Sequence, residues 1–546
     1  MTVADESEIV KTATAALREK RPLRHPRLKE AAAALHANRA AEAERLLAQY
    51  IERHPDDAGG LLLLAETALR LGRKEHAATL LARCVSVSPD YEAARFLYAS
   101  TLYQLNRLAD SLAELEHLLA VDPQNVLYLD MKAAVLGALA RHDEALLCRR
   151  ALADDHPNSS ELRAKYGRAL RSTGQRDAAV AAFRDAIALD PRCGSAWWSL
   201  ADLKTLRFSD SDIAAMETAL PEATGNDRMY MHFALGRAWG DRGDYPKSFE
   251  HYARGNAMKR LTVSYDADWL TKQVARCKAL FTREFFTRRE SSGCESRAPV
   301  FIVGMQRAGS TLIEQILGSH SAIEATAELP DITLLAERLA ERAAGEGKGA
   351  VYPELLAGLD GGVLRQLGES YLETTRPQRR LRKPFFLDKN PYNFLHVGLI
   401  RLILPEARIV DVRRHPLACC WSNFSAHYET GALFAYRMGE LGRAYADYVA
   451  LMAHFGAVLP GRIHRIVYDN LVGDPEGQIR RLLEHLGLPF EAACLQFHAN
   501  PRAMNSVSSE QVRQPLYSHA LEQWRDYEPW LGPLKAALGP ALESWR

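Results

Sequence analysis

Small residues and prolines recur every 34 residues through the first part of the chain. The prolines of this period are Pro55, Pro89, Pro123, Pro157 and Pro191. A second series keeps the same phase, with Ala65, Ala99, Ala133, Gly167 and Ala201. Small side chains at fixed offsets allow two antiparallel helices to pack closely, and a proline ends one helix before the next begins. The pattern therefore predicts a stack of helical hairpins.

A 34-residue period with small residues at fixed offsets is typical of tetratricopeptide (TPR) repeats. Five repeats are clear, a sixth from about Gly194 loses the pattern, and a seventh around residues 230–259 recovers part of it. We expect a charged tail over residues 1–25 and a TPR solenoid over residues 26–262. Stacked repeats form a curved surface with a concave groove. We favour a groove that holds a peptide or protein, although a rigid spacer or a dimerisation arm would have the same pattern.

The pattern changes after residue 262. Residues 263–298 are expected to form a helical junction and a linker, and beyond them short apolar runs alternate with helical segments. The candidate strands are Val300–Gly304, Phe385–Leu387, Arg408–Val412 and Ile463–Tyr468. Alternating strands and helices predict an α/β domain with a parallel sheet over residues 299–546. Ligands of such sheets bind beyond the carboxyl ends of the strands.

Residues 299–317, PVFIVGMQRAGSTLIEQIL, have the pattern of a strand, a loop and a helix. Such a loop directs backbone N–H groups and the positive end of a helix dipole to one point, which suits a phosphate. Gly304 and Gly309 have the G-x-x-x-x-G spacing of a nucleoside-triphosphate loop, but Ser310 stands where a lysine should follow. Arg307 is the cation of the loop. The pattern therefore favours a single 5′-phosphate that carries a smaller group.

The composition of the chain argues against several functions. Its 546 residues carry a formal net charge of +1, so no general affinity for nucleic acid or a membrane surface is indicated. The eight cysteines are scattered without a C-x-x-C motif, which argues against a zinc site or a disulfide scaffold. No apolar N-terminal targeting run and no apolar run of about 20 residues is present. We expect a cytoplasmic protein without metal, nucleic-acid or membrane partners.

The loop GMQRAGSTL resembles the 5′-phosphosulfate loop of sulfotransferases that use 3′-phosphoadenylyl sulfate (PAPS). The likeness extends over nearly the whole chain to the bacterial sulfotransferases with an N-terminal TPR region, which are similar to tyrosylprotein sulfotransferases. It implies an α-helical TPR solenoid followed by an α/β, P-loop-like sulfotransferase domain with a parallel sheet. PAPS would be the co-substrate and no metal would be required. The sulfate would lie against the residues Arg307, Ala308, Gly309, Ser310 and Thr311.

The resemblance assigns two further residues to catalysis. Glu328, in ATAELPD, takes the place of a glutamate that removes the proton of the acceptor hydroxyl, which is a poor nucleophile until a base acts on it. Glu324 is the alternative base. Lys389, in FFLDKNPYN, is expected to stabilise the bridging oxygen as the sulfuryl group leaves, with Arg307 on the other side. By themselves, Glu328 and Lys389 would be interpreted as surface residues at a helix start and in a turn.

The resemblance also implies a nucleotide site. Arg414 and Ser422 have the interval of the pair that binds the 3′-phosphate of PAPS, and an arginine fork with a hydroxyl suits a phosphate monoester. His415 stands where the family has an aspartate. Tyr468, in IVYDNLVGDP, would either contact the nucleotide or lie in the core at a strand end. The segment expected to close over the nucleotide contributes Ser508, Gln511 and Arg513.

The resulting hypothesis is in-line transfer of the sulfuryl group from PAPS to an acceptor hydroxyl, with Glu328 as the base. The groove of the repeats favours a peptide or protein acceptor, such as a tyrosine, while a sugar and a small phenol stay open. The likeness permits a homodimer. One alternative is a P-loop kinase or NTPase, against which the missing lysine argues. Another is a TPR scaffold with an inactive nucleotide-binding domain, against which the retained site residues argue.

Overall fold

The computed structural model describes residues 25–204, 206–289, 292–326, 328–345, 351–428, 431–500, 512, 516 and 519–546. Its contacts divide the chain into two compact units, residues 1–157 and residues 158–546. None of the described helices combines the length and the hydrophobicity that a bilayer span requires.

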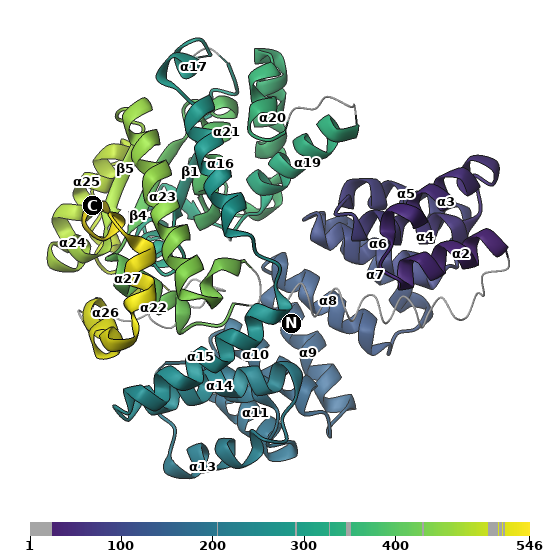
Figure 1. Ribbon diagram of the computed structural model, residues 1–546, viewed down its shortest axis with the longest axis horizontal. Coiled ribbons are helices and arrows are strands. Elements are labelled where there is room, and N and C mark those ends of the chain that lie inside the picture. Colours follow the sequence, from purple (N-terminus) through teal and green to yellow (C-terminus); the bar gives the residue numbers. More distant parts are fainter. Residues whose placement is uncertain are drawn as a thin grey trace. The chain divides into compact units, whose positions relative to one another are not determined.

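The first unit is built from antiparallel helical hairpins, as the 34-residue spacing predicts (Figure 1). Its helices are α2 (Pro26–His36), α3 (Ala40–Arg53), α4 (Ala58–Arg70), α5 (Lys74–Val87), α6 (Glu92–Gln104), α7 (Leu108–Val121), α8 (Val126–Ala138) and α9 (His142–Asp155). The repeated small residues Ala65 and Ala99 are completely buried. Asp57 and Asn125 cap α4 and α8 by accepting hydrogen bonds from first-turn N–H groups. The predicted hairpins are confirmed.

The second unit begins with more helices of the same kind. They are α10 (Ser160–Ser172), α11 (Arg176–Leu189), α12 (Gly194–Asp202), α13 (Asp210–Ala219), α14 (Gly225–Asp241) and α15 (Tyr245–Thr262). A Cβ atom on Gly167 would lie 2.6 Å from the ring of Phe183, which explains the small residue where α10 and α11 pack. The helix α12 has 9 residues and packs against α14. The repeat pattern is therefore altered here, as the sequence indicates.

The sheet has five parallel strands in the order β2-β3-β1-β4-β5. The strands are β1 (Pro299–Gly304), β2 (Ile323–Ala325), β3 (Phe385–Lys389), β4 (Arg408–Arg413) and β5 (Ile463–Val467). Ile302 of β1 pairs with Lys389 of β3, and Gly304 pairs with Val412 of β4. This register brings the ends of β1, β3 and β4 to one edge of the sheet. The predicted parallel α/β domain is confirmed, with β2 as a strand that the sequence pattern did not indicate.

Helices cover the sheet and connect its strands. They are α16 (Ala267–Leu280), α17 (Arg283–Thr287), α18 (Ser310–Gly318), α19 (Asp331–Gly345), α20 (Gly361–Thr374), α21 (Val397–Ile403), α22 (Pro416–Phe424), α23 (Met438–Val458), α24 (Tyr468–Gly473), α25 (Pro475–Leu486), α26 (His519–Glu522), α27 (Gly532–Leu538) and α28 (Ala541–Ser544). The helix α18 packs against β1 and β3, and α25 packs against β5. The segments after β1 and β4 thus run directly from a strand end into a helix, which is the arrangement that positions the site.

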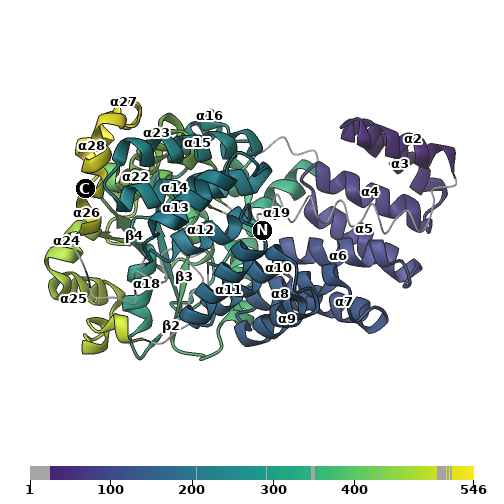
Figure 2. The same ribbon diagram turned by 90° about the horizontal axis from the view of Figure 1, so that it is seen from below.

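The helices α14 and α15 share one hydrophobic core with the sheet domain. The side-chain amide of Asn256 donates to the Phe424 carbonyl at 2.8 Å, and the ring of Phe249 stacks on Trp530 with ring centroids 5.3 Å apart. In Figure 2, α14 and α15 lie beside α22. The last helices of the repeat region are therefore part of the unit that contains the sheet.

Candidate active site

Two glycines give the loop after β1 its shape. Gly304 has a φ of 153°, and a Cβ there would lie 2.5 Å from the Val412 carbonyl oxygen. Gly309 has a φ of 107° and precedes α18, and a Cβ there would lie 2.7 Å from the ring of Tyr468. A side chain at either position would combine backbone strain with a steric clash. The loop therefore needs both glycines to pass so close to β4 and to Tyr468.

The loop ends at the N-terminus of α18, where backbone N–H groups precede the first intrahelical acceptors. Arg307 lies in the left-handed region with a φ of 66°, a conformation that is unfavourable for a side chain other than glycine. Its Nε atom donates to the Ser422 hydroxyl at 2.9 Å. Backbone strain at one residue is characteristic of binding sites, where the surrounding structure holds it. The loop thus places a guanidinium beside a helix N-terminus, an arrangement that suits a phosphate or a sulfate.

Arg414 is the first residue after β4 and lies against the same loop. Its Nη1 atom donates to the Arg307 carbonyl at 3.3 Å, and its guanidinium lies 5.2 Å from the centroid of the Tyr468 ring. Burial lowers the pKa of the Arg414 guanidinium, and the charge of Arg307 acts in the same direction. Two cations close together in a partly dry environment favour a bound anion between them. The structure therefore brings Arg307, Arg414, Ser422 and Tyr468 together around the loop.

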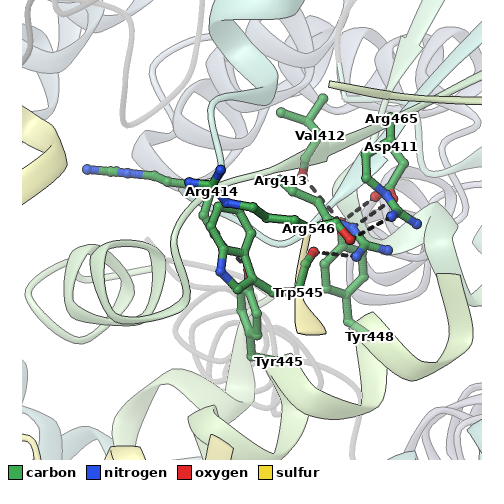
Figure 3. Close-up of polar contacts among 9 residues, drawn as sticks. All are labelled: Asp411, Val412, Arg413, Arg414, Tyr445, Tyr448, Arg465, Trp545 and Arg546. Atoms are coloured by element: carbon green, nitrogen blue, oxygen red, sulfur yellow. Dashed lines mark hydrogen bonds and ion pairs between the residues drawn. The ribbon is translucent and has the colours of Figure 1, made fainter. Parts of the chain in front are cut away.

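A polar network holds the end of β4 (Figure 3). Arg413 donates from Nε to the Asp411 carboxylate at 2.9 Å and from Nη1 to the Trp545 carbonyl at 2.5 Å. Two further side chains also donate to this carboxylate, those of Tyr448 and Arg465. The Tyr445 hydroxyl donates to the carbonyl of Arg414 at 2.7 Å. Because the Arg413 side chain and the Arg414 carbonyl are both held, the backbone that carries the Arg414 side chain is fixed.

His415 occupies the position at which the resemblance expects an aspartate. Its ring stacks on Trp524 with centroids 5.2 Å apart and an angle of 7° between the planes. Its backbone N–H donates to the Asp469 carboxylate at 3.3 Å. Asp469 follows Tyr468 at the start of α24, so it is a carboxylate from a different segment that braces the turn after β4. The spacing of the motif did not indicate that Asp469 would support this turn in place of an aspartate at position 415.

Lys389 ends β3 with a side chain that is only 3% exposed. Its ammonium is bonded to Glu328 and lies 3.7 Å from the Glu314 carboxylate. The Glu328 side chain is 53% exposed, while that of Glu314 is 6% exposed. The lysine thus has one partner that is open to solvent and one that is buried. A solvent-exposed carboxylate and a buried ammonium are therefore in direct contact at the end of β3.

Glu324, the alternative base, has a different environment. It is 4% exposed within β2, and its carboxylate accepts a hydrogen bond from the Leu381 N–H at 2.7 Å. This hydrogen bond comes from the backbone of a segment 57 residues further along the chain. Among the loop residues, Ser310 and Thr311 are buried in the first turn of α18, and Ala308 is buried beside them. Ser508, Gln511 and Arg513 lie outside the described residues.

Two neighbours of the site were not indicated by the motifs. Glu314 contributes the buried carboxylate beside Lys389. The sequence could have indicated it, because an acidic residue within the apolar run LIEQIL is unusual. Asn423 donates to the Gln306 carbonyl at 2.8 Å and thereby ties the loop to α22. No local pattern marks Asn423, because its partner is 117 residues away along the chain.

Comparisons with known proteins agree with this geometry. The Sulfotransferase family model matches residues 299–492. Two Tetratricopeptide repeat models match residues 76–135 and residues 28–92 and 165–203. The sulfotransferase match contains β1 to β5, and with them Arg307, Glu328, Lys389, Arg414 and Ser422.

Three curated proteins are similar to parts of this chain. An uncharacterized protein of Aquifex aeolicus is 31% identical over 67% of this chain and 48% of its own length. The omega-hydroxy-beta-dihydromenaquinone-9 sulfotransferase Stf3 of Mycobacterium tuberculosis is 30% identical over 20% of this chain and 30% of its own length. Protein-tyrosine sulfotransferase A of Caenorhabditis elegans is 21% identical over 43% of this chain and 63% of its own length. The chain therefore spans less than two thirds of each relative. It contains a sulfotransferase-family domain at residues 299–492 together with tetratricopeptide repeats.

Proposed function

We propose that this protein transfers the sulfuryl group of PAPS to an acceptor hydroxyl. The observation that carries the proposal is the meeting of Arg307, Ser422 and Arg414 at one loop, although the first two are 115 residues apart in sequence. A nucleotide with a phosphate at both ends of its ribose needs two separate cationic contacts. Arg307 with the N-terminus of α18 supplies one, and Arg414 with Ser422 supplies the other.

The chemical step follows from the residues at the ends of β1 and β3. A bond forms between the acceptor oxygen and the sulfur, and the bond from the sulfur to the 5′-phosphate oxygen breaks, so that 3′,5′-ADP (PAP) leaves. Glu328 receives the proton of the acceptor hydroxyl. Lys389 offsets the charge that develops on the bridging oxygen, and Arg307 acts from the other side.

The buried Glu314 has a supporting role in this scheme. Lys389 is bonded to Glu328 and lies 3.7 Å from Glu314. When Glu328 turns to the acceptor, Lys389 still has a carboxylate beside it, so the ammonium stays charged and near β3. Glu328 is therefore free to act as a base without leaving an isolated buried cation.

The acceptor that we favour is a tyrosine of a peptide or protein. Tetratricopeptide repeats commonly present a concave surface to such partners, and one relative is named as a protein-tyrosine sulfotransferase. Another relative is named for a hydroxylated menaquinone. Both classes of acceptor present a hydroxyl, so the same base and the same donor site serve either.

The test is a calorimetric titration of the full chain with PAP and with 5′-AMP. PAP should bind more tightly by about 10- to 100-fold, because the 3′-phosphate adds charge-assisted hydrogen bonds to Arg414 and Ser422. Arg414→Ala should remove this difference. Arg254→Ala is the control, since this arginine of α15 is 60% exposed and pairs with Glu250 on the same helix.

Two results would contradict the proposal. Equal binding of PAP and 5′-AMP would exclude a 3′-phosphate site, and magnesium-dependent hydrolysis of ATP would indicate a P-loop NTPase instead. If PAP binds as expected, transfer from labelled PAPS to tyrosine peptides and to a hydroxylated quinone decides the acceptor. Binding without turnover on any hydroxyl acceptor would favour a TPR scaffold with an inactive nucleotide-binding domain.

A further inference from the structure

The segment that carries Glu328 is attached to β3 at two points. The first lies directly after β2, where the Thr326 hydroxyl donates to the Leu387 carbonyl of β3 at 2.5 Å. At the second, the side-chain amide of Asn390 donates to the Leu329 carbonyl at 2.9 Å. Glu328 therefore lies between two hydrogen bonds that hold its backbone beside the end of β3.

The Asn390 side chain has two partners of opposite kind. Asn390 follows Lys389 directly and precedes the short 3₁₀ helix η3 (Pro391–His396). Its Oδ1 atom accepts from the Tyr392 N–H at 3.1 Å, while its Nδ2 atom donates to the Leu329 carbonyl. An ionised carboxylate could cap η3 in the same way but could not donate to a carbonyl. Because the Tyr392 N–H fixes the orientation of the amide, its donor faces Leu329.

The contact between Glu328 and Lys389 would be weak without a backbone link. Lys389 is buried, but the Glu328 side chain is 53% exposed. An ion pair with so exposed a partner holds its geometry poorly, because solvent screens the charges and ordering two long side chains costs entropy. The hydrogen bond from Asn390 to Leu329 joins the residue after the lysine to the residue after the glutamate. The two backbones are thus connected directly beside the ion pair.

We propose that Asn390 is a positioning residue for the transfer, which together with Thr326 keeps the Glu328 carboxylate close to the Lys389 ammonium and to the acceptor hydroxyl. This inference rests on the proposed function, since it concerns how Glu328 is placed to act as the base. Asn390 holds the backbone of the segment and not the Glu328 side chain, so the carboxylate can still turn from Lys389 to the acceptor. Loss of Asn390 should therefore slow the transfer and leave donor binding intact.

The first experiment compares the wild-type protein with Asn390→Ser. Serine keeps an acceptor that can cap η3 and adds no charge, but its side chain is too short to bind the Leu329 carbonyl. In transfer from labelled PAPS to a tyrosine peptide or a hydroxylated quinone, kcat should fall by about 10- to 100-fold. The calorimetric affinity for PAP should be unchanged, because the expected nucleotide contacts lie on other segments.

The second experiment asks whether Asn390 acts through Glu328. In the Glu328→Gln background the base is already absent, so Asn390→Ser should change kcat by less than about 2-fold. A purely structural role would instead multiply the two losses. The same cycle with Thr326→Val removes the other hydrogen bond with a side chain of the same shape. It should give the same pattern, and it tests the proposal even if Asn390→Ser does not fold.

The matched control is Asn125→Ser in the repeat region. Asn125 caps α8 by accepting from the N–H groups of Leu127 and Tyr128 at 3.1 Å and 3.4 Å, as Asn390 caps η3. This variant makes the same change at a helix cap and should leave kcat unchanged. Thermal unfolding of each variant shows whether the fold is retained.

The outcomes separate the two proposals. If the wild-type protein transfers no label from PAPS to either acceptor, the proposed function fails and the role of Asn390 fails with it. If the wild-type protein transfers the label and Asn390→Ser keeps full kcat, only the role of Asn390 is overturned. Losses that multiply with that of Glu328→Gln, or a loss of PAP affinity as large as the loss of kcat, would also overturn it.

Discussion

The glycine before α18 gives the sharpest test of the loop geometry. Ala at position 309 would adopt a φ of 107°, and its Cβ would lie 2.7 Å from Tyr468 Cδ2. The left-handed backbone costs about 1–2 kcal/mol for a residue with a Cβ. Overpacking against the ring costs a further 1–3 kcal/mol, roughly. Gly309→Ala should therefore lower the free energy of unfolding by about 2–5 kcal/mol.

Substitutions at two other glycines separate the cost of backbone strain from the cost of overpacking. Gly487, after α25, has a φ of 71° and open space around its Cβ position, so Gly487→Ala tests strain alone and should cost about 1–2 kcal/mol. Gly456, within α23, also has open space but a normal helical backbone, so Gly456→Ala should be neutral or should stabilise by up to about 1 kcal/mol. The three substitutions add the same methyl group.

Tryptophan fluorescence during denaturant unfolding is the assay. All 8 tryptophans lie in residues 158–546, so the signal follows the unit that holds the site. A further variant, Tyr468→Ala in the Gly309→Ala background, should recover the overpacking part because the ring is gone. The reasoning is refuted if Gly309→Ala costs no more than Gly487→Ala, or if removal of the ring recovers nothing.

Three further predictions follow from the site and its supports. Glu328→Gln should lower kcat in transfer assays by about 10²- to 10⁴-fold and leave the calorimetric affinity for PAP unchanged. Glu324→Gln should mainly lower the stability of the fold. If instead Glu324→Gln lost activity and Glu328→Gln lost only stability, Glu324 would be the base. Arg413→Met should destabilise the second unit by about 3–5 kcal/mol in denaturant unfolding, because it removes the main partner of a buried carboxylate, and a loss below 1 kcal/mol would contradict this. Burial lowers the pKa of His396 to about 4, so the unfolded chain takes up this proton first as the pH falls from about 6.5. This histidine should then lower the free energy of unfolding by about 1.5 kcal/mol between pH 6.5 and pH 5. His396→Gln, but not the exposed His498→Gln, should reduce the decrease of the whole protein by that amount.

Sequence patterns predicted the elements that repeat or alternate. The period of 34 residues indicated the hairpins from α2 to α11, and the apolar runs indicated β1, β3, β4 and β5. The strand β2 was missed because its 3 residues, Ile323–Ala325, are too few to show an alternation. The small residue Gly167 was also informative, because a single ring from the partner helix occupies the space that its side chain would need.

The candidate site was predicted only where its chemistry is local. The spacing of Gly304 and Gly309 indicated an anion-binding loop, since both residues act within one turn of the chain. The assignments of Glu328, Lys389, Arg414 and Ser422 came from family resemblance, and they stay proposals about PAPS. The neighbouring side chains that support these residues, Glu314 and Asn423, are marked weakly or not at all by the sequence pattern.

What the sequence by itself determined is the order and type of the elements, because periodicity and turn residues act between near neighbours along the chain. It also determined the shape of the loop after β1, which depends on backbone freedom at Gly304 and Gly309. The tertiary structure alone decided which distant residues meet. Examples are Arg307 with Ser422 and the network of Arg413 with Trp545. Such contacts depend on strand register and helix packing, which bring together side chains more than 100 residues apart.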